Sequence, residues 1–184
     1  MVAYRRYYIK GGTWFFTVNL KDRRSMHLTE NIELLRYSVA VVKQHRPFII
    51  DAWVVLPEHL HCIWTLPHND DDFSSRWRDI KGCFSRTLKR IHLLHTGVHF
   101  TPPLQNNRII PLSGQHQPTE QAGRSAADDY RRHVDYIHIN PLKHGWVTRV
   151  IDWPFSTFHR DVQRGLYPPN WAGDSFDLSC GERR

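Results

Sequence analysis

Two apolar runs joined by a two-residue link constrain the fold more than any other feature of the sequence. Residues 48–56 are almost continuously apolar, which is typical of a strand buried on both faces. Pro57-Glu58 joins this run to a second one, residues 59–66, and Pro67 ends it. We therefore expect a core built on two adjacent buried strands.

A strand and a helix are expected before this pair. Residues 14–20 follow two glycines and are rich in aromatic and β-branched residues, which favours a first strand. Thr29 is expected to cap a helix that ends at Arg46-Pro47, because the residue before a proline is pushed out of the helical region. The predicted buried stripe of this helix is Ile32, Leu35, Val39 and Val42.

A basic helix is expected after the second buried strand. Three aspartates, residues 70–72, precede it, and Ser74 or Ser75 is expected to cap it. Its predicted buried stripe is Trp77, Ile80, Phe84, Leu88 and Ile91. Most of its basic residues lie off that stripe, namely Arg78, Lys81, Arg86, Lys89 and Arg90.

Residues 96–126 have little periodicity, and we expect them to be loop-like and poorly packed. Only residues 108–112 resemble a strand; if they form one, it should pair with residues 14–20 as the fourth strand of the sheet. A further helix is expected from Asp128 to Asn140-Pro141, followed by an aromatic, proline-punctuated tail over residues 146–184.

This order of elements is that of an α+β fold, a ferredoxin-like antiparallel sheet packed by helices. The 184 residues fit a single domain, 1–184, and no internal repeat is present. No apolar run is long enough to cross a bilayer, and the N-terminus lacks the apolar stretch of a secretory signal. Three widely spaced cysteines argue against a disulfide framework, so a cytoplasmic protein is expected.

The net charge of +7 is concentrated in the first hundred residues, where 15 Lys and Arg stand against 9 Asp and Glu. Seven tryptophans accompany this surplus. Such a composition favours binding to a nucleic acid, whose phosphates attract the basic residues and whose bases stack on the tryptophans. A requirement for solubility alone would also explain the charge.

His59 and His61 form the sharpest local feature. Alternation along a strand places both side chains on one face, where two imidazoles are able to share a metal ion. A structural or solvent-facing pair is the alternative interpretation of so short a motif.

Tyr136 and Asn140 lie four residues apart on the last predicted helix, so they project from one face. A tyrosine hydroxyl is a plausible nucleophile towards a phosphodiester, and an amide oxygen is a hard donor able to complete a metal site. On spacing alone, Tyr136 is also consistent with an ordinary half-buried helix tyrosine.

Three longer segments resemble the REP-associated tyrosine transposases, which belong to the single-tyrosine HUH transposases and are named for repetitive extragenic palindromes. They are residues 4–8 (YRRYY), 53–64 (WVVLPEHLHCIW) and 133–146 (HVDYIHINPLKHGW). Residues 153–161 and 165–168 of the tail are similar to the same family.

The resemblance implies that His59 and His61 bind Mg²⁺ or Mn²⁺, that Tyr136 is the nucleophile, and that Asn140 is a third ligand or lies beside the metal. The implied reaction cuts and rejoins one DNA strand through a 5′-phosphotyrosine. The implied substrates are the single-stranded feet and hairpins of repetitive extragenic palindromes. Whether the protein works as a monomer or a dimer stays open. Phosphates are expected to contact Arg5, Arg6, Arg78, Lys81, Arg86, Lys89 and Arg90.

One departure from the family pattern leaves a second interpretation open. Family members usually follow the basic helix with a strand containing an Arg-Phe-Trp-Glu-His-like sequence, and residues 96–126 hold unrelated sequence in its place. The alternative is a catalytically impaired or domesticated descendant that binds hairpin DNA without cutting it.

Overall fold

The computed structural model describes residues 9–96, 104–112 and 126–173. The strands are β1 (Thr13–Leu20), β2 (Ile49–Val55), β3 (His59–Thr65) and β4 (Leu104–Pro111). The helices are α1 (His27–Glu30), α2 (Ile32–His45), α3 (Phe73–Thr96), α4 (Ala126–Lys143) and α5 (Phe158–Gln163), with a 3₁₀ turn η1 (Val150–Asp152).

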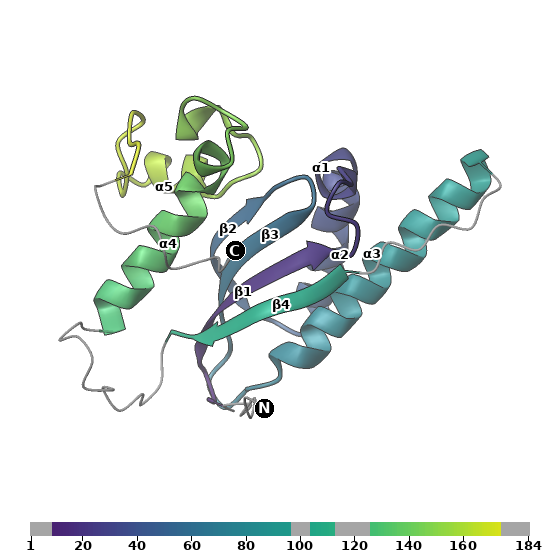
Figure 1. Cartoon of the computed structure of the whole chain (residues 1–184). Coiled ribbons are helices and arrows are strands. Elements are labelled where there is room, and N and C mark those ends of the chain that lie inside the picture. Colours follow the sequence, from purple (N-terminus) through teal and green to yellow (C-terminus); the bar gives the residue numbers. More distant parts are fainter. Residues whose placement is uncertain (1–8, 97–103, 113–125, 174–184) are drawn as a thin grey trace, which may run out of the picture.

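The four strands form one sheet in the order β2-β3-β1-β4, and every neighbouring pair is antiparallel. Helices α2 and α3 cover one face of this sheet, and α4 crosses the other (Figure 1). The chain order and strand order together are those of the expected ferredoxin-like α+β fold. The two HUH histidines therefore lie on a central strand.

Alternation along the strands divides the core into two layers. Trp14, Phe16 and Val18 of β1 pack in the layer that contains α2 and α3. Phe15, between them in sequence, packs in the layer that contains α4. Because successive side chains point to opposite faces, each strand contributes to both layers.

The expectation that residues 96–126 are loop-like is wrong for the part that the structure describes. Strand β4 pairs with β1 along its length, from Trp14 opposite Pro111 to Leu20 opposite Leu104. The conditional prediction that residues 108–112 pair with the first strand is thus confirmed for Arg108 to Pro111, and the strand begins earlier. Its polar start, residues 105–107, resembles a loop in sequence, but an edge strand needs only a backbone partner on one side.

Two predicted helix caps are wrong. Thr29 lies inside α1, where its hydroxyl donates to the Met26 carbonyl, and α2 begins separately after Asn31. At the start of α3, the Asp72 carboxylate accepts the Ser75 backbone N–H at 2.9 Å. Asp72 therefore takes the capping role that we expected of Ser74 or Ser75, because its carboxylate satisfies a donor left open by the first turn.

Two predicted helix limits also differ. Ile91 is 40% exposed rather than buried, since the C-terminal part of α3 projects past the end of the sheet (Figure 1). Helix α4 continues through Pro141 to Lys143 instead of stopping at Asn140. A proline this near the helix end removes only one intrahelical bond, and the His144 N–H still donates to the Asn140 carbonyl.

The tail docks on the outer edge of β2. The Val55 N–H donates to the Phe155 carbonyl, and the Thr157 N–H donates to the Trp53 carbonyl. The Thr157 hydroxyl in turn accepts the Trp53 N–H at 2.8 Å. These bonds satisfy backbone groups that would otherwise form an open sheet edge. Across the described residues, no helix is both long and apolar enough to span a membrane.

Candidate active site

His59 and His61 form the floor of the site. Both side chains are fully buried, and their ring centroids lie 4.9 Å apart at a steep angle. Leu60, between them, packs in the opposite layer. The shared face predicted from strand alternation is confirmed.

Each imidazole is oriented through its Nδ1 atom. His59 Nδ1 lies 2.8 Å from a Glu58 carboxylate oxygen, and His61 Nδ1 lies 2.9 Å from the Thr17 hydroxyl. A partner on Nδ1 turns Nε2 towards the site and fixes the ring, as second-shell groups do for metal-binding histidines. The Nε2 atom of His61 is buried and has no hydrogen-bond partner among the described residues.

Helix α4 supplies the wall opposite these histidines. Tyr136 is 1% exposed, and its ring centroid lies 5.1 Å from that of His61. Two helical turns later, the His144 ring lies 5.2 Å from that of His59. Asn140 is midway in sequence between Tyr136 and His144, so helical spacing puts its side chain on the same side of α4 as Tyr136.

The Asn140 side chain has an unmet requirement for polar partners. It is fully buried, and neither its amide oxygen nor its amide nitrogen has a hydrogen-bond partner in the described part of the chain. Buried polar atoms are nearly always satisfied in native proteins. Together with the buried Nε2 of His61, this points to a ligand between β3 and α4.

Positive groups surround the histidines. The Lys143 ammonium lies 4.9 Å from the centroid of the Tyr136 ring. Burial holds the pKa of His61 well below its ordinary value, and the neighbouring basic side chains of His59, His144, Lys143 and Arg23 lower it further. His61 is therefore neutral at physiological pH, which is the form that binds a metal.

Glu58 stays ionised beside this cluster. Burial alone would raise its pKa, but the hydrogen bond from His59 and the charges of His59 and Arg23 outweigh burial, so the pKa is lowered. The carboxylate is thus an acceptor for His59 Nδ1–H.

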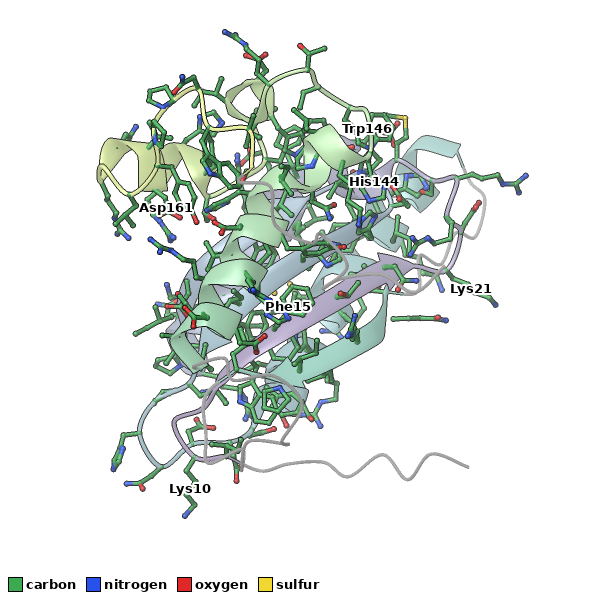
Figure 2. All side chains as sticks on the ribbon, turned by 60° about the vertical axis from the view of Figure 1, so that its left-hand side comes forward. Lys10, Phe15, Lys21, His144, Trp146 and Asp161 are labelled. Carbon is green, nitrogen blue, oxygen red and sulfur yellow. The ribbon has the colours of Figure 1, made fainter. Side chains whose placement is uncertain are left out.

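Phe15 closes the apolar side of the site. Its ring is stacked at 5.6 Å from His61 and lies 6.2 Å from Tyr136 and 4.9 Å from His133. Figure 2 shows Phe15 on the sheet beneath α4, with His144 towards the far end of that helix. Packing of this kind restricts the rotamers of the histidine and tyrosine side chains.

The donor set fits a divalent metal bound by nitrogen and oxygen. In residues 9–96, 104–112 and 126–173, no group of three His, Cys, Asp or Glu side chains forms a metal centre. The two imidazoles of His59 and His61 with the Asn140 amide oxygen would make a mixed nitrogen and oxygen donor set, which is compatible with a divalent metal. Cys62 packs in the other layer and is not a candidate ligand.

The predicted DNA-binding residues are not all gathered at this site. Helix α3, which carries Arg78, Lys81, Arg86, Lys89 and Arg90, covers the opposite face of the sheet. Arg78 is paired there with Asp79 at 3.3 Å. Arg5 and Arg6 lie outside the described residues.

The tail holds α4 on both sides of the tyrosine. The Tyr167 hydroxyl donates to Asp135 at 2.5 Å, and Asp161 lies 3.1 Å from His138 Nε2. Arg160 bonds Asp161 at 2.8 Å and donates to the backbone carbonyl of Ile50 in β2. Asp161, buried beside α4 (Figure 2), thereby links the tyrosine helix to the sheet.

Several functional candidates emerge only from the structure. Thr17 reaches His61 because the β1–β3 register places these two residues opposite each other. His144 and Lys143 belong to a family-like segment whose pattern does not assign them a role. Arg23 lies in a loop that carries no recognisable motif.

A ferredoxin-like sheet with two buried histidines on a central strand, faced by a tyrosine on a covering helix, defines the class of the tyrosine transposases. Known proteins agree. A REP-associated tyrosine transposase of Escherichia coli (strain K12) is 58% identical over 185 residues, which cover 100% of this chain and 98% of the relative. The chain belongs to the REP-associated tyrosine transposase family.

Two further comparisons support this assignment. A protein of Haemophilus influenzae (strain ATCC 51907 / DSM 11121 / KW20 / Rd), provisionally given the same family name, is 38% identical over 174 residues, 95% of each chain. A solved REP-associated tyrosine transposase bound to a REP hairpin matches with a TM-score of 0.78 and 57% identity, covering 100% of this chain and 99% of that one. No family model matches the sequence.

Proposed function

We propose that this protein cleaves and rejoins one strand of DNA beside a hairpin of a repetitive extragenic palindrome, through a covalent 5′-phosphotyrosine on Tyr136. The observation that carries the proposal is the position of Tyr136, buried with its ring 5.1 Å from that of His61. The hairpin bound by the solved relative supports the choice of DNA.

In the proposed cleavage step, the Tyr136 oxygen attacks the scissile phosphorus. A bond from phosphorus to the tyrosine oxygen forms, and the bond to the 3′-oxygen breaks. The tyrosine proton leaves through water, and the departing 3′-oxygen gains one by the same route. A 3′-hydroxyl of a second strand reverses the step, so rejoining requires no nucleotide hydrolysis.

His59, His61 and Asn140 are the residues that would hold Mg²⁺ or Mn²⁺. When bound, such an ion polarises the scissile phosphate and offsets the negative charge that builds on its oxygens. Glu58 and Thr17 orient the two imidazoles through Nδ1.

The other residues of the site prepare the nucleophile. Phe15 and the docked tail keep α4 packed on the sheet, so the tyrosine hydroxyl has a restricted position. The Lys143 ammonium, 4.9 Å from the Tyr136 ring centroid, stabilises negative charge on the phosphate and on the tyrosine oxygen.

The alternative function is that of a descendant that binds hairpin DNA without cutting it, and the main argument for this alternative is weakened. That interpretation relied on the irregular segment 96–126, and strand β4 now supplies the sheet edge that seemed to be missing. The proposal is supported further by the packing of α4 against β3, in which the Tyr136 ring lies against His61.

The test is a labelled hairpin with a single-stranded extension, incubated with protein and Mn²⁺ and then denatured. We expect a covalent protein–DNA adduct. A 3′-end label should remain with the protein and a 5′-end label should be released, because the phosphate stays on the 3′ fragment. Tight binding without any adduct in Mn²⁺ or Mg²⁺ would establish the non-cutting alternative.

A further inference from the structure

The loop that follows β1 is basic and exposed. It contains Lys21, Arg23 and Arg24, all of which are exposed. Arg24 is partly neutralised by Asp22 at 3.6 Å. Lys21 and Arg23 are therefore the side chains of this loop whose positive charge is most available to an external anion.

Backbone bonds tie both ends of this loop to the turn before the HUH strand. The Leu20 N–H donates to the Glu58 carbonyl at 2.7 Å, and the Leu28 N–H donates to the Pro57 carbonyl at 3.1 Å. Because Glu58 immediately precedes His59, these bonds fix the loop beside the turn that leads into the histidine pair.

Cations flank the pair from a second direction as well. Lys143 and His144 at the end of α4 lie against Tyr136 and His59, respectively. In Figure 2, Lys21 and Lys10 mark opposite ends of β1, and His144 lies towards the Lys21 end.

We propose that Lys21 and Arg23, together with Lys143, form a binding track for the phosphates of the single-stranded DNA next to the cleaved bond. This inference rests on the proposed function and deepens it. We expect a strand whose phosphate reaches the buried histidines to approach them between the β1–α1 loop and the end of α4.

The track is proposed separately from the basic helix α3. That helix packs on the face of the sheet opposite α4, and its C-terminal part projects past the end of the sheet. Arg23 presents a planar guanidinium that matches phosphate oxygens in a two-point geometry. Lys21 adds a point charge at the same end of the sheet.

The test is the salt dependence of DNA binding by Arg23→Gln, Lys21→Gln and the double variant. The probe is a fluorescent hairpin with a single-stranded extension, and the control is Lys10→Gln at the far end of β1. Each lost phosphate contact should reduce the slope of log K against log salt by about 0.7, roughly a fivefold loss of affinity at 0.1 M salt. Lys10→Gln should leave the slope unchanged.

A second DNA, the same hairpin without its extension, locates the effect. The loop variants should bind it as the parent does, because the track serves the single strand. An unchanged slope in both loop variants, or an equal fall for Lys10→Gln, would overturn the proposal. These residues are exposed, so unaltered melting curves are expected to confirm folded variants.

The outcomes separate this inference from the proposed cleavage. A reduced slope with no adduct from the parent protein would retain the binding track and reject the covalent reaction. An adduct from the parent protein with an unchanged slope in the loop variants would retain the covalent reaction and reject the binding track.

Discussion

His59 and His61 belong to the same short motif, but their side chains have different surroundings. His59 has an ionised carboxylate on Nδ1, whereas His61 has a neutral hydroxyl. His61 is also the histidine stacked on Phe15 and closest to Tyr136. Of the two, His61 is therefore expected to couple metal binding most directly to the nucleophile.

We predict that His61→Ala abolishes cleavage and weakens Mn²⁺ binding without unfolding the domain. The reason is the loss of one imidazole ligand from a site with few donors. Calorimetric titration with Mn²⁺ measures the effect, and His133→Ala is the matched control. His133 is also a buried histidine of this layer, with its ring centroid 4.9 Å from that of Phe15, but it lies outside the proposed ligand set. Equal Mn²⁺ affinity in His61→Ala and the parent would show that His61 is not a ligand.

Strand alternation put His59 and His61 on one face, and helical spacing put Tyr136 and Asn140 on another. The family resemblance then joined these four residues into one candidate site and gave them roles. These patterns did not indicate Thr17 or Arg23. Thr17 acquires its role from the β1–β3 register, and Arg23 from two backbone bonds between distant segments. Such relations depend on tertiary structure and leave no local pattern.

At the scale of elements, the tail acts as a clamp on the tyrosine helix. It binds α4 at Asp135 and His138, which lie on either side of Tyr136, and it binds β2 through Arg160. The tail was expected only as an aromatic, proline-rich segment. Its position on the β2 edge could not be read from composition.

We expect Asp161→Asn to lower both the melting temperature and the rate of adduct formation. The substitution removes the charge that binds His138 and Arg160, and hydrogen bonds to charged groups are worth about 1.5–3 kcal/mol. Asp152→Asn is the control, since Asp152 forms an exposed pair with Arg149 in the same tail. Equal adduct rates for Asp161→Asn and the parent at a temperature where both are folded would contradict the clamp.

The elements themselves were largely predictable from periodicity. The stripe of α2 and the buried strand β3 appear as expected, because apolar spacing determines which residues face the core. The expectation that residues 48–56 form a strand buried on both faces is wrong, because β2 is an edge strand in which Ile49 is 60% exposed. Helix caps, the end of α4 and the start of strand β4 were not predicted correctly. In each case a neighbour decides the outcome: the Asp72 carboxylate for the start of α3, and the open edge of β1 for the polar residues of β4.

At the scale of the whole molecule, the sheet separates two chemically different faces. One carries α4, the histidines and the proposed phosphate track, and the other carries α2 and the basic helix α3. Under the proposed function, single-stranded DNA is expected on the face that carries α4 and the histidines, and α3 is on the opposite face.

We predict tighter binding to a hairpin with a 5′ single-stranded extension than to a blunt duplex of the same length. The catalytic face needs an accessible backbone, and affinity for the hairpin should fall steeply with salt as counterions are released. Competition titrations at two salt concentrations measure both effects. Indistinguishable affinities for the two DNAs would favour a general nucleic-acid binder over a transposase.

The central claim is that Tyr136 becomes covalently joined to DNA, and peptide mapping of the adduct tests it most directly. After nuclease and protease digestion, we predict a nucleotide mass on the α4 peptide at Tyr136 and no adduct from Tyr136→Phe, whose DNA affinity stays within a few-fold of the parent. Tyr130→Phe, on the same helix and half-buried, should retain the adduct. An adduct formed by Tyr136→Phe at the parent rate, or a nucleotide mapped to another residue, would contradict the account.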